Sequence, residues 1–321
     1  MSEQGEALKD NKVLNFLNEQ KILVVIILIV IILTSRTTYF ASFTNILNIF
    51  NYISIEGIII IGMTYLIILR ELDLSVGSTM ALSGVLAIYF QKYGVFWGIF
   101  SGLLLGIAVG FLNGLLVIKL KLSSIAATIG TMIMLNGFVF AFTKDATIKG
   151  TNKLFPIIAN TVILKIQIPV IVFIVLVIIF EIILKKTYFG RNIYAVGGNA
   201  IASKFFGINV NRVKMSAFVI TGFLAGLAGV LLASKLNIAS GRIGLNTAIV
   251  VITAVLLGGV SLSGGEGSVA RAFQGMLLIG ILNSAMVILQ TNSFIQDMIR
   301  GFILILILVI DAISVSRAKY V

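Results

Sequence analysis

Residues 46–78 read ILNIFNYISIEGIIIIGMTYLIILRELDLSVGS: an apolar run at 46–69 ends abruptly in a polar segment at 70–78. A helix needs roughly 20 apolar residues to cross the hydrocarbon core of a bilayer, so the run predicts a transmembrane helix. Three charges, two hydroxyls and a glycine then interrupt the apolar sequence. Irregular backbone at membrane depth persists only where protein buries it or where it lines a water-filled cavity. The stretch therefore predicts a broken helix beside an internal pathway; the alternative is an ordinary cytoplasmic turn.

Comparable apolar runs recur along the chain and set its class. Apolar residues make up 59% of the 321 residues and charged residues 11%, whereas soluble domains are roughly half apolar and a quarter charged. The sequence predicts an all-α polytopic membrane protein, with one transmembrane domain over residues 1–321. Its first apolar run lacks a small-residue cleavage site, so we expect a retained span. We expect ten transmembrane helices, near 16–35, 46–69, 76–91, 94–118, 123–143, 167–184, 213–234, 246–260, 268–289 and 295–314.

The charge distribution predicts the orientation of these spans. The net charge of +12 fits membrane topology better than nucleic-acid binding, because Lys and Arg concentrate in cytoplasmic loops. With the N-terminus inside, ten spans also return the C-terminus inside, and most of the Lys and Arg residues then fall on that side. We therefore expect both termini in the cytoplasm, with a cytoplasmic N-terminal segment at 1–20 and a long cytoplasmic loop at 185–214. The outer loop at 144–166 is unusually basic for its side.

Two short similarities suggest an internal repeat. The sequence GFLN at 110–113 returns as GILN at 280–283, and LDLSV at 72–76 resembles LNTAI at 245–249. Each pair is separated by five predicted spans, an odd number, so the two copies must point in opposite directions. Such 5+5 inverted repeats are typical of transporter folds. Chance similarity between apolar segments is the alternative.

Polar residues in or beside the spans are candidates for a transport pathway. An intramembrane carboxylate such as Glu56 is costly and is a functional hypothesis by default; it could face a vestibule, pair with Arg300, stay protonated, or mark a kink. We expect Asp73 to cap the free N–H groups of the helix at 76–91. Side-chain amides also commonly tie membrane helices together. The candidate pathway residues are Glu56, Asp73, Ser75, Asn113, Asn246 and Asn283.

The loop at 185–214 contains a predicted short helix. Asn199 is a suitable N-cap and Gly207 a suitable C-terminal stop, and a helix of about two turns between them puts Ile201 and Phe205 on one face. Apolar side chains on an exposed helix indicate a partner groove; a helix lying on the membrane surface is the alternative. The candidate contact residues are Asn199, Ile201, Lys204, Phe205, Phe206 and Gly207.

The residue inventory argues against catalysis. The chain contains no cysteine and no histidine, which removes thiolate chemistry, imidazole bases and most transition-metal sites. No G-x-x-x-x-G-K-[ST] phosphate loop occurs, so any ATP must be bound by another chain, and we expect no cofactor and no metal here. A membrane enzyme would need clustered acid, base or metal residues, and a pure scaffold would not explain the break at 70–78. An ion-coupled secondary transporter stays open as the alternative function.

An ordered set of motifs from about residue 44 to 312 resembles the permease subunits of bacterial ATP-binding cassette importers for monosaccharides of the ribose, xylose and arabinose type. The motifs are GMT at 62–64, DLSVGS at 73–78, LNG at 112–114, AVGGN at 195–199, GINVNRV at 207–213, the glycine pattern at 222–229, and SLSGG at 261–265 with GSV at 267–269.

The resemblance implies a pathway formed with a second permease copy or a paralogue in the bacterial inner membrane. A separate ATPase would dock on the coupling helix at 199–206, and an extracytoplasmic sugar-binding protein would deliver the solute. The chain also departs from its relatives. Many of them have Gly-Gly or Ser-Gly where it has Arg70-Glu71, Glu-Leu-Asp where it has Gly-Leu-Asn at 244–246, and an amide where it has Glu56. The identity of the solute is therefore left open.

Overall fold

The computed structural model describes residues 21–37, 39–292, 294–296, 298–299, 301–302, 304–306 and 309. Its elements follow in chain order as α2 (Lys21–Arg36), α3 (Phe43–Ile68), α4 (Val76–Phe90), η1 (Gln91–Tyr93), α5 (Val95–Ile118), α6 (Ser124–Thr143), β1 (Ile148–Lys149), α7 (Ile157–Asn160), β2 (Val162–Ile163), β3 (Ile166–Gln167), α8 (Ile168–Lys186), α9 (Tyr188–Gly198), α10 (Ala200–Phe205), α11 (Val210–Leu236), β4 (Ile238–Ala239), α12 (Thr247–Leu257) and α13 (Val269–Ile288).

Six helices in the described part of the chain are long and apolar enough to cross a membrane: α3, α5, α6, α8, α11 and α13. Each overlaps a predicted span, so a polytopic helical membrane protein is supported. The helices α4 and α12 have only 15 and 11 residues, fewer than the roughly 20 that a full crossing needs. The predicted spans at 16–35 and 295–314 lie partly outside the described residues. Ten crossings and cytoplasmic termini therefore stay predictions.

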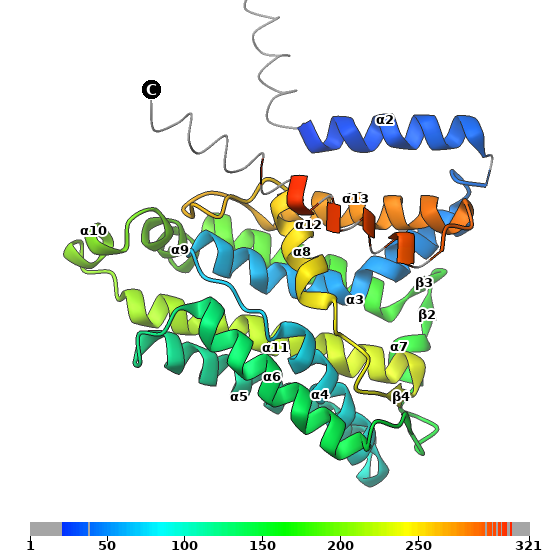
Figure 1. The fold of residues 1–321 in the computed structure, drawn as a ribbon, viewed down its shortest axis with the longest axis horizontal. Helices are drawn as coiled ribbons and strands as arrows, with labels where there is room; N and C mark the ends of the chain where they lie inside the picture. The colour runs from blue at the N-terminus through cyan, green and yellow to red at the C-terminus, as the bar shows by residue number, and fades with distance from the viewer. Residues whose placement is uncertain are drawn as a thin grey trace, which may run out of the picture.

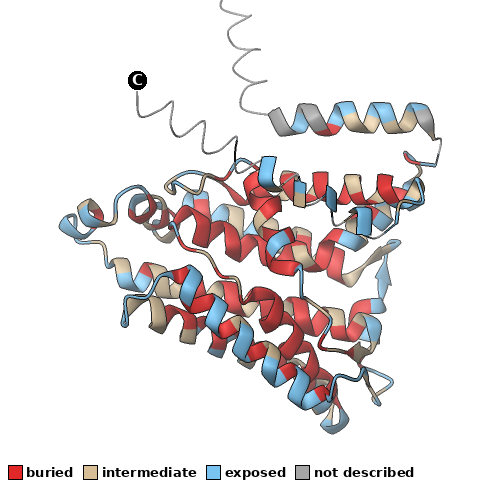
Figure 2. Cartoon of the chain, in the orientation of Figure 1, coloured by how far each residue is buried: buried red, intermediate tan, exposed pale blue. Residues whose placement is uncertain are grey.

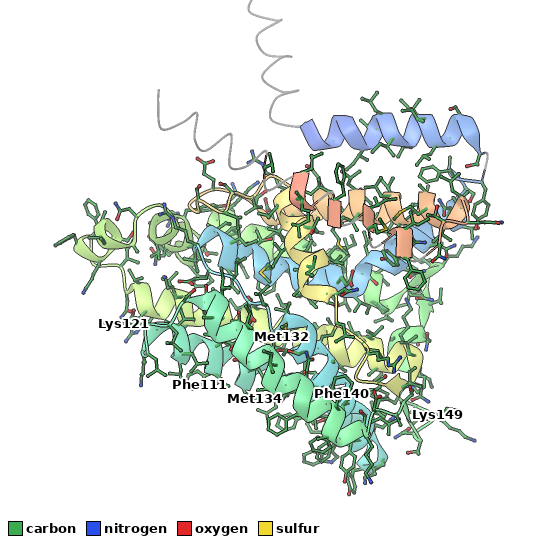
Figure 3. The ribbon with its side chains drawn as sticks, viewed as in Figure 1. Phe111, Lys121, Met132, Met134, Phe140 and Lys149 are labelled. Carbon is green, nitrogen blue, oxygen red and sulfur yellow. The ribbon has the colours of Figure 1, made fainter. Side chains whose placement is uncertain are left out.

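Two short strand pairs accompany the helices in the described residues, and this part of the chain is otherwise mostly helical, as the sequence predicts. β1 pairs with β4 in an antiparallel register that places Ile148 opposite Ala239, and β2 pairs with β3 in a hairpin. Both pairs lie at the end of the molecule opposite to α9 and α10 (Figure 1). Lys121 and Lys149 lie at opposite ends of the molecule (Figure 3). This agrees with the prediction that they lie on opposite sides of a membrane.

The helix α3 forms the centre of the bundle. Its residues 58–61 are four consecutive isoleucines with no exposed surface, because α8, α11, α12 and α13 all pack against this helix. In contrast, exposed residues line the outward face of α6, and buried ones follow α3 and α11 (Figure 2). Phe111, Met134 and Phe140 are among the exposed side chains of α5 and α6. A broad apolar exterior of this kind is expected where a helix faces lipid or another membrane chain.

A glycine contact fixes how closely α5 and α11 approach. A Cβ atom on Gly106 would lie 2.3 Å from the backbone oxygen of Gly222, and a Cβ on Gly222 would lie 2.2 Å from the oxygen of Gly106. Small residues let membrane helices pack backbone to backbone in this way. The glycines of α5 therefore serve as a packing face against α11.

Replacing Gly106 with alanine is expected to lower the stability of the folded chain by about 1–3 kcal/mol, because the added methyl group forces two backbones apart. The measurement is the midpoint of thermal unfolding in detergent. Gly137→Ala is the matched control, since a Cβ at Gly137 meets no atom within 4 Å. Equal midpoints for the two variants would contradict the packing argument.

Candidate functional site

The break between α3 and α4 is buried and bonded to α6. Leu72 N donates to Ser124 Oγ at 3.2 Å, and Leu74 N donates to Thr128 Oγ1 at 3.1 Å. The two hydroxyls lie four residues apart, on one face of α6, and so match alternate N–H groups of the extended segment. Backbone that belongs to no helix is thus satisfied inside the protein, as membrane depth requires. From Glu71 to Ser75 the segment is buried or partly buried, and its depth in a membrane stays a prediction.

Three predicted pathway residues meet at the start of α4. Asp73 Oδ1 accepts from Ser75 N at 2.8 Å and from Ser75 Oγ at 2.6 Å. Asn113 Nδ2 donates to Asp73 Oδ2 at 3.2 Å and to Ser75 Oγ at 2.9 Å. All three residues are almost fully buried. We call Asp73, Ser75 and Asn113 the polar triad.

The triad corrects the expected role of Asp73. The N-cap residue of α4 is Ser75, whose side chain makes no capping hydrogen bond. Its hydroxyl instead donates to Asp73, and the only helix-start N–H that Asp73 is seen to receive is the one on Ser75 itself. Asp73 therefore holds Ser75 and Asn113 in place before the first turn of α4 and does not cap that turn.

The two short helices begin beside one another. A Cβ on Gly77, in the first turn of α4, would lie 2.2 Å from Gly244 O, and a Cβ on Gly244 would lie 2.4 Å from Gly77 O. Gly244 has a φ of +88°, a backbone conformation that favours glycine. It lies in the irregular segment that leads into α12. The backbones at the starts of α4 and α12 are thus in direct contact. These starts contain the two similar sequences, 72–76 and 245–249, of the suggested repeat.

Glu56 lies near the start of α12. Thr247 Oγ1, in the first turn of α12, donates to Glu56 Oε1 at 3.5 Å. Because Glu56 is near the middle of α3, α12 begins alongside the middle of the central helix. The neighbouring Asn246 is exposed and is the N-cap of α12 without a side-chain capping bond. The predicted partner Arg300 lies outside the described residues.

Asn283 belongs to a different part of the molecule. It lies in the second half of α13 and lines a cleft of about 230 Å³ together with Asn45, Tyr52 and Ser284. Asn45 Oδ1 accepts from Ser284 Oγ at 2.9 Å across this boundary between α3 and α13. The six pathway candidates therefore divide between the polar triad, the start of α12 and this cleft.

The predicted short helix is present as α10. Asn199 Oδ1 accepts from Ile201 N and from Ala202 N, both at 3.0 Å, so the N-cap prediction is confirmed. Gly207 has a φ of +80°, as a C-terminal stop requires. Ser203 is the one buried residue of α10.

The outward surface of α10 is strongly apolar. Ile201, Phe205 and Phe206 are 73%, 87% and 85% exposed, and Lys204 is also exposed. This helix forms the tip of one end of the molecule (Figure 1). A tip that projects beyond the bundle presents these side chains to whatever lies outside that end.

The helix before α10 is docked tightly on the end of α3. A Cβ on Gly197 would lie 1.9 Å from Ile68 O, and the same oxygen accepts from Gly265 N at 2.8 Å. Tyr194 Oη donates to Gly267 O at 2.7 Å. Burial raises the pKa of Tyr194 to about 12, so the phenol keeps the proton that it donates. These contacts hold α9 (Tyr188–Gly198) against the end of α3, and α9 in turn fixes the position where α10 begins.

Several functional contacts were not visible in the sequence. Ser124 was not a candidate, although it holds the segment before the triad. Arg70 and Glu71 were noted as part of the polar break and as a departure from relatives, and the structure joins them to Gly198 and Lys214. Two charged residues beside an apolar run indicated that each needs a partner. The sequence could not identify these partners, because they lie more than 100 residues away along the chain.

Replacing Thr128 with valine is expected to destabilise the fold by about 1–2 kcal/mol, because Leu74 N loses its acceptor inside the protein. Thr131→Val is the matched control, because the hydroxyl of Thr131 donates to Ala127 O of its own helix. Thermal unfolding of both variants in detergent compares them directly. If Thr131→Val costs as much as Thr128→Val, the bridge to Leu74 contributes nothing.

Comparison with known proteins gives a consistent match. The family described as "Branched-chain amino acid transport system / permease component" matches residues 45–308. The ribose import permease protein RbsC of Haemophilus influenzae is 35% identical over 302 residues, which cover 92% of this chain and 94% of that protein. RbsC of Bacillus subtilis is 39% identical over 83% of this chain and 84% of its own length. The L-arabinose transport system permease protein AraH of Escherichia coli is 33% identical, covering 85% and 84%. No solved structure matches the chain.

Proposed function

The chain belongs to the branched-chain amino acid transport system / permease component family, and from this premise we propose that it forms the translocation pathway for a monosaccharide of the ribose or arabinose kind. It is a membrane-embedded permease subunit of an ATP-binding cassette importer and not an enzyme; ATP hydrolysis belongs to a separate subunit. The match gives no support to the ion-coupled alternative. The proposal of a sugar rests on the names of the relatives, three of which import ribose or arabinose.

The observation that carries the coupling to an ATPase is α10. A six-residue helix with three highly exposed apolar side chains gains little by facing water. Its capped and glycine-terminated geometry presents Ile201, Phe205 and Phe206 from a fixed position. We assign it as the coupling helix that inserts into a groove of the ATPase. Asn199 and Gly207 shape the helix, and Lys204 contributes a charge beside the contact.

The pathway is assigned to the broken helices. Helix N-termini present free N–H groups and a positive dipole end, and discontinuous helices of this kind form solute sites near the middle of many transporters. The starts of α4 and α12 meet at Gly77 and Gly244, and the polar triad lies beside them. Glu56 and Asn246 flank the second start, and Asn283 lies in the separate cleft between α3 and α13. Within the triad, Asn113 Oδ1 is buried and has no partner among the described residues, so a sugar hydroxyl could reach it only after the surrounding helices move apart.

The pairing of helices supports the proposed 5+5 repeat. α4 packs against α5, and α12 packs against α13, so corresponding elements of the two halves have corresponding neighbours. Ten spans would place both termini on the same side as α10, and the excess of Lys and Arg on that side assigns it to the cytoplasm. We further assign a second permease copy or a paralogue as the membrane partner, and an extracytoplasmic sugar-binding protein at the end that carries the β-pairs.

Purification tests the assignment directly. The tagged chain is extracted in mild detergent from membranes of its native host, and the co-purifying proteins are identified by mass spectrometry. We expect an ATP-binding cassette ATPase in stoichiometric amount, together with ATP-dependent uptake of radiolabelled ribose or arabinose after reconstitution. A chain that purifies without an ATPase and moves either sugar down an ion gradient would refute the proposal.

A further inference from the structure

The dipeptide Arg70-Glu71 joins the turn after α3 to both sides of α10. Arg70 Nη2 donates to Gly198 O at 2.8 Å, one residue before the N-cap of α10. Glu71 Oε1 accepts from Lys214 Nζ, in the first turns of α11. The chain between these two anchor points, residues 199–213, contains α10 and its exposed apolar surface.

The Glu71–Lys214 contact is sheltered from solvent, whereas the Arg70–Gly198 hydrogen bond is exposed. The side chain of Glu71 is 10% exposed and that of Lys214 is 23% exposed, so the ion pair is screened far less than a surface pair. Removing one member of such a pair leaves a charge without compensation, and this penalty is larger than for exposed pairs. The Glu71–Lys214 anchor therefore resists separation when α10 is displaced, and the Arg70–Gly198 hydrogen bond adds a second, exposed attachment.

The backbone of Arg70 adds a second argument. Its φ is +61°, in the left-handed region that disfavours residues with a side chain. Glycine would adopt this conformation without strain. Arginine supplies what glycine cannot at this position, a guanidinium group that donates a hydrogen bond to Gly198 O.

The same short segment continues directly into the polar triad. Glu71 is followed by Leu72 and Leu74, whose N–H groups are held by α6, and by Asp73 and Ser75 of the triad. Only Leu72 separates Glu71 from Asp73, the first residue of the polar triad. Because hydrogen bonds hold residues 72–75 in place, a displacement of Gly198 or Lys214 would move the start of α4 as well.

We propose that Arg70 and Glu71 form a two-point clasp through which movement of α10 is transmitted to the start of α4. The clasp deepens the proposed function and rests on it: α10 receives the ATPase, and the clasp carries its displacement to the pathway. Arg70 and Glu71 are positioning residues that act through the segment they hold.

The first arm of the test measures the clasp without any partner. The chain contains no cysteine, so spin labels are introduced at Lys204→Cys on α10 and at Lys119→Cys beyond α5, both exposed positions. The distance distribution between the labels is recorded by pulsed electron paramagnetic resonance. We expect Arg70→Gly combined with Glu71→Gln to broaden it at least about twofold, since loss of coupled contacts releases α10. An unchanged distribution overturns the clasp.

The second arm measures transmission in the complex with the co-purified ATPase. Glu71→Lys and Lys214→Glu are each expected to lower ribose uptake per ATP hydrolysed about tenfold, and the double exchange is expected to restore it to within about threefold. Lys186→Glu, an exposed lysine after the apolar part of α8, is the charge-reversal control. Singles no worse than the control, or a double exchange no better than the singles, overturn the proposal.

The two arms separate this inference from the function it rests on. A broadened distance distribution with unchanged uptake per ATP means that the clasp only holds the loop, which overturns transmission. If the wild-type complex shows no ATP-dependent uptake of either sugar and no bound ATPase, the proposed function fails and transmission fails with it. The distance arm still decides in that case whether the clasp exists.

Discussion

Phe205→Asp is expected to abolish ATP-dependent sugar uptake and to remove the ATPase from the purified complex. The side chain is 87% exposed, so the free chain tolerates aspartate without loss of core packing. In a partner groove, however, the change exchanges a large apolar contact for an unpaired carboxylate. Burying such a charge, together with losing an aromatic anchor, costs about 3–5 kcal/mol or more, which corresponds to a loss of binding of at least about a hundredfold.

The matched control is Leu164→Asp. Leu164 is 89% exposed and lies in the turn of the β2–β3 hairpin, at the end opposite to α10. Both variants add the same charge at an exposed apolar site. Membrane yield and thermal unfolding are compared with co-purified ATPase and uptake. If the Phe205→Asp chain retains its ATPase and transports normally, α10 is not the coupling helix. The alternative, a helix that lies on the membrane surface, is then favoured.

Asp73→Ala is the second large effect, with an expected fall in uptake of about a hundredfold or more. The substitution removes the acceptor of Ser75 N and Ser75 Oγ and one acceptor of Asn113. Each orphaned buried donor costs about 1–3 kcal/mol, so the start of α4 loses its position. Asp73→Asn is expected to be milder, because its carbonyl still accepts from Ser75 while its NH₂ group opposes the amide of Asn113.

Ser78→Ala supplies the comparison for Asp73→Ala. The hydroxyl of Ser78 donates to Ser75 O within the same turn, so its loss leaves the polar triad intact. Uptake of ribose and arabinose is measured for all three variants at equal membrane abundance. Equal and mild effects of Asp73→Ala and Ser78→Ala would reduce Asp73 to a local backbone contact with no role in the pathway.

Local features of the sequence predicted local structure well. The apolar runs gave six long helices at the expected places, because length and hydrophobicity decide what a bilayer accepts. The caps of α10 followed from Asn199 and Gly207, whose roles depend on neighbours within three or four residues. These predictions needed no knowledge of the tertiary fold.

Features that depend on distant segments were missed or misread. Leu72 N finds its acceptor at Ser124, 52 residues away, and Glu71 finds Lys214, 143 residues away. The capping role of Asp73 was wrong because the N-cap of α4 is Ser75, two residues further along the chain, and Asp73 accepts from Ser75 instead. Likewise, no linear pattern could reveal that Asn283 lies in a cleft apart from the polar triad.

The contact between Gly77 and Gly244 has an evolutionary consequence. Two backbones meet there without a side chain between them, so neither position offers a chemical group that could distinguish one solute from another. A side chain gained at either glycine would collide with the opposite half of the molecule. If the proposed pathway lies here, we expect adaptation to a new solute to proceed through substitutions around this contact, at Asp73, Asn113, Glu56 or Asn246, while the two glycines are retained.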